Sequence, residues 1–166
     1  MSVTASPSSR RPSAADAYVV CREAVYAGDV AAHRALRRQV FVLEQQLFTG
    51  DDADLHDDDP RTVHAVGLAD GEVCGAVRLY PLDEAGHEWK GDRLAVARHR
   101  RARHLGAALV RFAVRTAGER GGTRMVAHIQ LPNVAFFELL GWCADGPPAP
   151  FHGVDHQLMT IPLARP

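Results

Sequence analysis

Three strand-like runs follow one another in the middle of the chain, with no helical pattern between them. Residues 62–69 (TVHAVGLA) and 72–81 (EVCGAVRLYP) flank Asp70-Gly71, and two β-rich runs around Asp-Gly are the strongest short-range signal for a hairpin. After a short loop, residues 89–96 (WKGDRLAV) predict a further strand. A fully parallel, doubly wound sheet needs a helix between strands, so this succession argues against that fold and favours a mixed sheet.

The other expected elements begin on either side of these strands. A short apolar run at 17–24 predicts a first strand, and Asp29 can cap the helix that follows it. A second helix begins at about Leu105 and ends at Gly121-Gly122, because glycine is common just after a helix C-terminus. The apolar faces are formed by Leu36, Val40, Leu43 and Leu47 in the first helix, and by Leu105, Ala108, Leu109, Phe112 and Thr116 in the second.

The C-terminal part of the chain adds three further strands and one helix. Residues 125–131 (MVAHIQL) predict a strand, 134–140 (VAFFELL) a short helix, and 142–163 two strands around a Pro/Gly-rich turn. The complete order is β-α-β-β-β-α-β-α-β-β. This order predicts an α/β (α+β) fold in which a mixed, mostly antiparallel sheet of about six to seven strands is flanked by helices.

Length and composition indicate one globular domain. The chain has 166 residues, 46% of them hydrophobic, which fits a single domain over residues 17–166 preceded by a disordered tail at 1–16. The net charge of −1 argues against a nucleic-acid-binding protein, and no apolar run is long enough to span a membrane. Three widely spaced cysteines without a zinc spacing fit a reduced, cytoplasmic chain.

The clearest chemical signal lies where the strand at 89–96 leads into the Leu105 helix. Backbone N–H groups at a helix start form an anion site, and arginines beside it suit a diphosphate. The alternative is a solvated basic turn, but positive side chains at a helix N-terminus oppose the helix dipole, which makes that interpretation less favourable. Four arginines add positive charge at this turn: Arg98, Arg100, Arg101 and Arg103.

Two segments carry a family resemblance. Residues 101–106 (RARHLG), which open an amphipathic helix, resemble the R-x-x-G-x-G/A signature with which the GNAT superfamily of N-acetyltransferases binds the pyrophosphate of acyl-CoA. Residues 133–142 (NVAFFELLGW) resemble the second GNAT signature, N-x-x-A-x-x-F-Y-x-x-x-G-F, allowing for gaps. The two segments stand in the family's order and at its normal separation. The resemblance, which covers Tyr18 to Leu163, implies the GNAT acyl-CoA N-acyltransferase fold.

A narrower resemblance is to a small bacterial branch of the GNAT proteins. Its features here are residues 40–45 (VFVLEQ), followed by Asp54, Asp57 and His64. The branch also carries a C-terminal G-x-P-H-x-x-M, which residues 153–159 (GVDHQLM) match with aspartate in place of proline. Because members of this branch mostly lack an assigned substrate, the closer resemblance supports the fold more than a particular reaction.

The GNAT resemblance implies an enzyme that transfers an acetyl group from its co-substrate acetyl-CoA to a primary amine of a small molecule or an amino terminus. The amine would attack directly in a ternary complex, and a homodimer through the C-terminal strands is a frequent family arrangement. The backbone of 94–96 would pair with the pantetheine arm, and one of its N–H groups would polarise the thioester. The cofactor-binding residues implied are Leu94, Ala95, Val96, Arg101, Ala102, Arg103, His104, Leu105, Gly106, Ala107, Asn133 and Phe136.

The sequence departs from the family pattern in two places. Ala102 and His104 stand where the first signature usually has glycine, which permits positive φ and close approach of a phosphate; Gly106 is retained, so we expect CoA binding to persist. Phe137 stands where many GNAT enzymes carry the tyrosine that protonates the leaving thiolate. Either another group or water donates that proton, or the chain is a catalytically silent acyl-CoA-binding regulatory module.

Three residues are candidates for proton transfer. Glu44 lies on the first helix, where GNAT substrates often bind; the alternative is a solvated helix glutamate. His156 matches the C-terminal motif, and imidazole is the usual proton carrier near neutral pH. Cys143 could donate a proton in place of Phe137, although a buried thiol is the simpler interpretation. A lone strand histidine such as His128 is more often structural.

An acidic run occupies residues 51–59 (DDADLHDDD), and we expect it to be a solvated loop. The run lacks the glycine and terminal glutamate of an EF-hand, and His56 and His64 do not have the spacing of a zinc site, so we expect no bound metal. A further hypothesis is that this acidic rim, including Asp54 and Asp57, attracts a cationic amine substrate.

Overall fold

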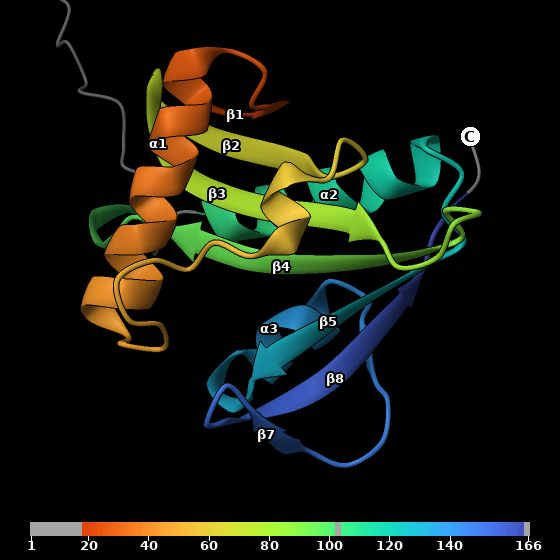
Figure 1. Cartoon of the computed structure of the whole chain (residues 1–166). Helices are drawn as coiled ribbons and strands as arrows, with labels where there is room; N and C mark the ends of the chain where they lie inside the picture. Colours follow the sequence, from red (N-terminus) through yellow and green to blue (C-terminus); the bar gives the residue numbers. More distant parts are fainter. Residues whose placement is uncertain (1–17, 102–103, 165–166) are drawn as a thin grey trace, which may run out of the picture.

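The structure, a computed structural model, describes residues 18–101 and 104–164. The expected tail at 1–16, and Ala102 and Arg103 of the expected phosphate loop, lie outside the described residues. Eight strands form one sheet in the order β1-β2-β3-β4-β5-β8-β6, with β7 also paired to β8 (Figure 1). The strands are β1 (Val19–Glu23), β2 (Val63–Ala69), β3 (Glu72–Pro81), β4 (Glu88–Val96), β5 (Arg124–Gln130), β6 (Cys143–Ala144), β7 (Ala149–Phe151) and β8 (Val154–Pro162).

The sheet is mixed and mostly antiparallel, as the element order predicted. The hairpin at Asp70-Gly71 is confirmed, since β2 and β3 pair across it. The strand count is eight rather than six to seven because the Pro/Gly-rich turn contains two very short strands, β6 and β7. The only parallel pair within the described residues joins β4 to β5, and its register covers Glu88–Lys90 against Arg124–Val126. Beyond this short pairing the two strands diverge, and the resulting gap is visible in Figure 1.

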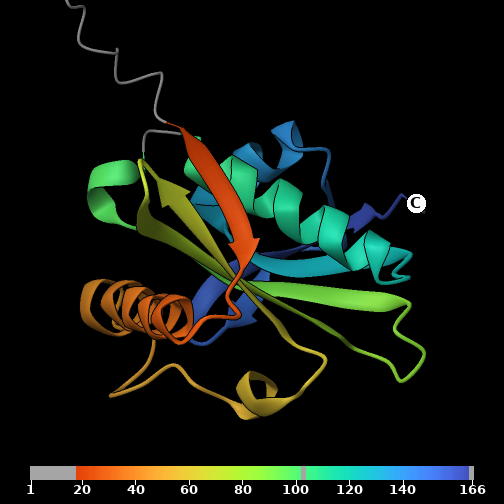
Figure 2. The ribbon, with the colours of Figure 1, turned by 90° about the horizontal axis from the view of Figure 1, so that it is seen from above.

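Helices cover both faces of the sheet. Viewed from above in Figure 2, α1 (Ala27–Arg37) lies on one face, and α2 (Leu105–Glu119) and α3 (Val134–Leu139) lie on the other. The helix α2 packs over β2, β3 and β4. Its Leu105 and Leu109 approach closely because Gly67 and Gly75 face each other across the β2–β3 pair. A Cβ at Gly67 would lie 2.8 Å from Leu105, and one at Gly75 would lie 2.5 Å from Leu109, so only glycine allows this packing.

The first helix differs from the prediction at both ends. Asp29 does not cap it: the N-cap is Tyr26, and the Asp29 carboxylate accepts hydrogen bonds from Arg22 at 2.8 and 3.0 Å. After Arg37 the chain continues as a wider helical segment, η1 (Arg38–Glu44), in which Gln45 N–H donates to the Val40 carbonyl five residues earlier. This widening shifts the side chains around the axis, so that the predicted apolar stripe breaks and Leu43 is 50% exposed.

The acidic run is only partly solvated: Asp51, Asp54 and Asp58 are exposed, whereas Asp52 and Asp57 are buried in an ion-pair network. Arg37 and Arg78 are fully buried, and they pair with Asp52, Asp57 and Asp54 of this run. The prediction of a solvated loop was wrong for the buried aspartates, because the arginines that compensate their charge lie on other elements of the fold. Asp54 and Asp57 are engaged by arginine, so these two carboxylates are not free to attract an amine as the acidic-rim hypothesis expected. The pairs are Arg37–Asp52 (2.8 Å), Arg37–Asp57 (2.5 Å), Arg78–Asp54 (2.6 Å), Arg78–Asp57 (2.9 Å) and Arg78–Asp92 (2.7 Å).

The buried His33 makes stability depend on pH. Its ring is 1% exposed, its Nε2 lies 3.1 Å from the Val77 carbonyl, and burial lowers its pKa from 6.5 to about 4. Between about pH 6.5 and about pH 4, the His33 ring is therefore protonated in the unfolded chain but not in the folded chain. The contribution of His33 to the free energy of unfolding is fully present above the unfolded pKa and falls as pH drops toward about 4.

We expect His33→Gln to remove this dependence while it retains a donor to Val77. The free energy of unfolding of the native chain, measured with urea, should fall by about 3 kcal/mol between about pH 6.5 and about pH 4 because of His33. In the variant, this part of the fall should be absent. His64, which touches the His33 ring and whose pKa burial also lowers, provides the background dependence in both proteins. Parallel curves for the two proteins would contradict this assignment.

Candidate active site

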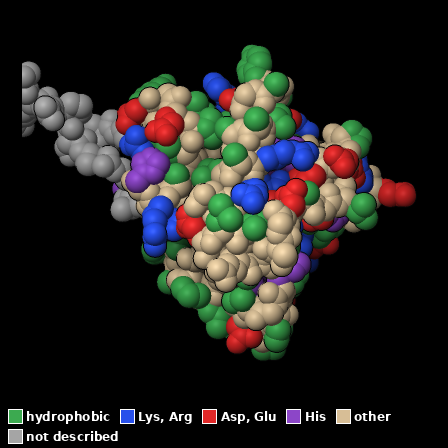
Figure 3. Space-filling model, turned by 60° about the vertical axis from the view of Figure 1, so that its left-hand side comes forward, with side chains coloured by type: hydrophobic (Ala, Val, Ile, Leu, Met, Phe, Trp, Pro, Cys, Tyr) green, Lys and Arg blue, Asp and Glu red, His purple; other side chains and the backbone are tan. Residues whose placement is uncertain are grey.

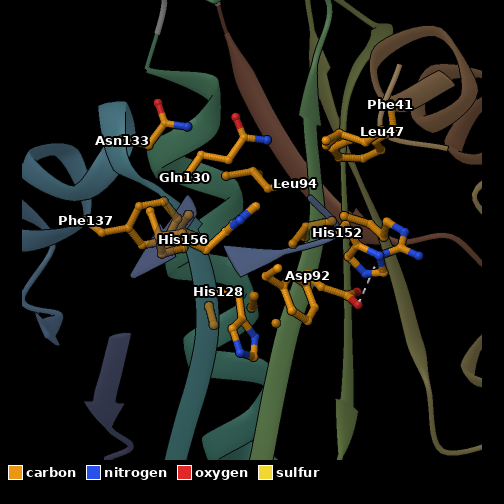
Figure 4. Close-up of a pocket in the computed structure, with 18 of the residues that line it drawn as sticks. Phe41, Leu47, Asp92, Leu94, His128, Gln130, Asn133, Phe137, His152 and His156 are labelled. Carbon is orange, nitrogen blue, oxygen red and sulfur yellow. Dashed lines mark ion pairs between the residues drawn. The ribbon is translucent and has the colours of Figure 1, made fainter. Parts of the chain in front are cut away.

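A cavity of about 160 Å³ lies between β4 and β5, where the two strands diverge. It begins where the two strands stop pairing, after Lys90 and Val126. Figure 4 shows side chains of both strands directed into this gap, with His156 between them. Because β5 no longer pairs with β4, the β4 backbone from Gly91 to Val96 presents N–H and C=O groups to the cavity side without a strand partner. Such an edge fits a ligand that contains amide groups.

The β4 strand has a bulge at the middle of this edge. The register with β3 shifts between Ala76 and Arg78, and Arg93 adopts a left-handed conformation with φ of 53°. The side chain of Arg93 is held in place by Asp52, with Nε 2.9 Å from Oδ2. The bulge thus rests on the buried ion network, and it precedes Leu94, whose side chain lines the cavity.

The start of α2 lies at the end of this edge. The N–H groups of Leu105, Gly106 and Ala107 have no intrahelical partner, because the first helical bond runs from Ala108 N–H to the His104 carbonyl. His104 has φ of 55°, so it adopts the left-handed conformation that glycine would supply. At the described positions, these backbone N–H groups are therefore oriented as the predicted anion site requires.

Two arginines of the basic turn, Arg100 and Arg101, point in different directions. Arg101 donates from Nε to the Val96 carbonyl at 3.0 Å and from Nη2 to Glu44 at 2.5 Å, so it stays beside the cleft. Arg100 instead turns to the β2–β3 hairpin, where it lies 3.3 Å from Asp70. The expectation that all four arginines flank one anion is therefore wrong for Arg100. On the face seen in Figure 3, basic and acidic side chains are interspersed rather than gathered in a basic patch.

The three candidates for proton transfer lie in different places. His156 is 7% exposed and lines the cavity. Glu44 is not in the cavity lining; it pairs with Arg101, whose hydrogen bond lowers the Glu44 pKa and weakens it as a base. Cys143 is exposed on β6, outside the lining, because Trp142 occupies the inward position next to it. Of these three candidates, only His156 lines the cavity.

The side chain of His156 is fixed in one tautomer. Its Nδ1 lies 2.7 Å from the Val154 carbonyl, which can only accept a hydrogen bond. Nδ1 therefore carries the proton, and Nε2 retains its lone pair. This arrangement suits a group that accepts a proton at Nε2.

The sequence reasoning missed a cluster of rings around His156. His128 stacks on Phe151 at 4.1 Å, and His152 meets the same ring at 4.3 Å. His128 and His152 line the cavity, and burial lowers the pKa of both. The signal was the segment PFHGVDH, which places one phenylalanine and two histidines on either side of the β7–β8 turn.

Two residues of the cavity lining have buried polar atoms that form no hydrogen bond in the described part of the chain. Within the described residues, His128 Nδ1 and Trp142 Nε1 are buried without a hydrogen-bond partner. Asn133 also lines the cavity, whereas Phe136 is 37% exposed and lies edge-on to Phe137. The cofactor-side residues of the second signature are therefore brought to the cleft or its rim.

One group of potential metal ligands is found in the described ranges, away from the acidic run. Glu72, Cys74 and His99 place one ligand atom each within 4.8 Å of one another. Burial raises the pKa of the Cys74 thiol, and Arg100 lies 3.9 Å from Glu72. A neutral thiol and a neighbouring guanidinium both disfavour a cation at this place.

No helix in 18–101 or 104–164 is long and apolar enough to cross a membrane.

A mixed sheet that splays between one parallel pair, with a helix start at the end of the splayed edge, offers backbone groups that suit an elongated anionic ligand. The model of the acetyltransferase (GNAT) family matches residues 21–142. The chain therefore belongs to the GNAT family and is an acyltransferase that uses acyl-CoA.

Several solved structures share this fold. A candidate N-acetyltransferase from Lactobacillus plantarum has 25% identity and a TM-score of 0.76, with 88% of this chain and 99% of that chain covered. ElaA of Escherichia coli has 19% identity and a TM-score of 0.74, with 87% and 98% covered. An acyl-CoA N-acyltransferase from Pseudomonas aeruginosa has 23% identity and a TM-score of 0.71, with 87% and 99% covered. The comparison with curated proteins found no match.

Proposed function

We propose that this chain is an N-acetyltransferase that passes an acetyl group from acetyl-CoA to a primary amine of a small molecule or an amino terminus. The observation that carries the proposal is the unpaired β4 edge, which runs from the start of α2 to a buried histidine with a free Nε2. We further propose that the reaction takes place in the cytoplasm, since the three cysteines are free thiols.

The donor is held through backbone groups at both of its polar parts. The N–H groups at the start of α2 bind the diphosphate, and Arg101 adds charge beside them. The free edge of β4 pairs with the pantetheine amides as a strand would. An N–H group at the bulge next to Arg93 donates to the thioester oxygen, which gains charge as the amine attacks.

His156 acts as the base at the acceptor. The neutral amine nitrogen attacks the thioester carbon, the new C–N bond forms, and the C–S bond breaks with its electron pair on sulfur. The nitrogen gives its surplus proton to His156 Nε2, while the Val154 carbonyl stabilises the cation through Nδ1–H. Phe137 has no proton to give, so the thiolate takes one from water.

His156→Ala should lower kcat by at least about 100-fold, because a positioned base contributes about 10²–10⁴ to proton transfer. Free thiol is followed with acetyl-CoA and a panel of amines. The Kd for acetyl-CoA should change little, since the backbone holds the donor. His87→Ala, at an exposed histidine before β4, is the matched control. Undiminished turnover in His156→Ala would remove this residue from the mechanism.

A second candidate function is a catalytically silent acyl-CoA-binding module. It is favoured by Phe137, which is buried and packs edge-on against Trp142, so that no hydroxyl occupies the position of the usual proton donor. The same assay separates the two functions. Thiol release stimulated by one amine class supports the enzyme, whereas tight CoA binding without turnover on any amine supports the module.

A further inference from the structure

The chain contains a single lysine, Lys90, among its 19 lysine and arginine residues. All the others are arginine, whose guanidinium stays protonated in proteins and is therefore not a nucleophile. The Nζ atom of Lys90 is thus the only primary amine on any side chain of this protein. It belongs to the same chemical class as the acceptor proposed above.

Lys90 lies on β4 at the point where the cavity begins. It is the last residue of β4 that pairs with β5, opposite Val126, and Gly91 after it already lines the cavity. Residues two apart on a strand share a face of the sheet, and so do directly paired residues, which places Lys90 on the same face as Asp92 and His128. Both of these residues line the cavity (Figure 4).

One aromatic ring connects Lys90 with the imidazoles of the site. The Lys90 Nζ atom lies 5.1 Å from the centroid of the Phe151 ring. The same ring stacks on His128 at 4.1 Å and meets His156 at 5.4 Å. Burial and then the positive charge of Lys90 lower the pKa of His128, which indicates that the two groups are close. The amine is therefore one ring away from His156, the residue proposed as the base.

The surroundings of Lys90 favour its neutral form. Lys90 is half-buried and forms no ion pair with a carboxylate of the described residues, since Asp92 is engaged by Arg78 at 2.7 Å and by Arg93 at 3.6 Å. Burial lowers the pKa of Lys90; Asp92 opposes this effect, and the charges of Arg93 and Arg78 add to it. At neutral pH a larger share of Lys90 is therefore an unprotonated, nucleophilic amine than for an exposed lysine.

We propose that Lys90 is a self-acetylation site, to which the chain transfers the acetyl group of its own bound acetyl-CoA. This inference rests on the proposed function for the donor and for the place of the thioester at the β4 bulge. The neutral Nζ attacks the thioester carbon, the new C–N bond forms, and the C–S bond breaks with its electron pair on sulfur. The nitrogen gives its surplus proton to water, and the thiolate takes a proton from water.

The donor brings its acetyl group toward Lys90. In the proposed function the diphosphate lies at the start of α2, beyond the C-terminal end of β4, so the pantetheine arm runs along β4 in the direction of Lys90. Arg93 at the bulge is three residues from Lys90, about 10 Å along the strand, and an extended lysine side chain covers about 6 Å. A change of rotamer away from the Phe151 ring can thus bring Nζ to the acetyl group without movement of a strand.

The test is mass spectrometry of the native chain after incubation with acetyl-CoA and no amine. We expect the chain to gain one acetyl group at Lys90. Because trypsin does not cut after an acetylated lysine, residues 79–93 should then appear as one acetylated peptide. Lys90→Arg keeps the positive charge and removes the nucleophile, so this variant should gain no acetyl group in the same peptide. A Lys90 that stays unmodified in the native chain would overturn the inference.

A second lysine on the surface measures chemical acetylation by the thioester alone. Arg115→Lys introduces it on α2, where the native side chain is 66% exposed and lies outside the cavity lining. An amine held beside a bound donor reacts as if within one molecule, so Lys90 should be acetylated at least about tenfold faster than the introduced lysine. Gly106→Val, in which we expect weak CoA binding, should slow the reaction at Lys90 only. Equal rates at the two lysines would overturn the inference.

Thiol release and the modification of Lys90 distinguish this inference from the proposed function. Acetylation of Lys90 without thiol release stimulated by any amine would support the self-acetylation site and reject transfer to a separate acceptor. Turnover of an amine with Lys90 unmodified would do the reverse. Absence of both reactions, with CoA bound, would reject both proposals.

Discussion

Gly106→Val should weaken acetyl-CoA binding by at least about 100-fold, or about 2.7 kcal/mol. Gly106 is the second residue of α2, and its N–H is one of the three that have no partner within this helix and that we propose to bind the diphosphate. A Cβ here would make only ordinary contacts of 3.8 Å with Phe136 and Val96, so the protein itself has room for it. A branched side chain would instead occupy the space above the N–H groups that the diphosphate needs.

Calorimetry with CoA measures the loss, and thermal unfolding checks that the variant is folded. Gly28→Val is the matched control, because Gly28 lies in the first turn of α1 with nothing within 4 Å of its Cβ position. Pantetheine, which lacks the diphosphate, should lose much less affinity than CoA. Micromolar CoA binding retained by Gly106→Val would show that the diphosphate lies elsewhere.

The parts of the fold that sequence predicted well are those whose signals are local. The hairpin at Asp70-Gly71 is determined by a turn and its flanking alternation, and the helix from Leu105 is determined by its own apolar periodicity and the glycines that end it. The free N–H groups at the start of that helix follow from the helix itself. The part of the cleft that we propose binds the cofactor could therefore be predicted from the sequence.

The part of the cleft where we propose that the acceptor binds could not be predicted from the sequence, because it depends on contacts between distant residues. The left-handed Arg93 is set by pairing of β4 with β3 and by a carboxylate 41 residues earlier in the chain. The imidazole of His156 gains its free Nε2 from a turn that forms only when β7 pairs with β8. Composition showed the aspartates of the acidic run, but not that Arg37 and Arg78 would be buried with them.

Removal of one buried cation should be the most destabilising single change in this network. Arg37→Met removes the guanidinium that Asp52 and Asp57 share, each of which has a side chain only 3% exposed, and leaves Asp57 paired with Arg78 and Asp52 paired with Arg93. Because the buried network then holds one more carboxylate charge than its remaining arginines compensate, we expect a loss of up to about 3–5 kcal/mol. The matched control is Arg61→Met, which removes an exposed partner of Asp59 and should destabilise the fold far less, because solvent screens that pair.

The pH dependence of urea unfolding identifies the cause of this loss. Burial alone would raise the Asp57 pKa, but hydrogen bonds from Arg37 hold it well below the ordinary value. A lowered pKa stabilises the fold above about pH 4 and loses that contribution as pH falls further. Arg37→Met should therefore unfold with a shallower dependence in the acid range than the native chain. Its turnover should fall as well, because Asp52 also holds Arg93 and so the bulge at which we propose that the thioester binds. If Arg37→Met is no less stable than Arg61→Met, the network does not hold the acidic run in place, and the bulge must be maintained by β3 pairing alone.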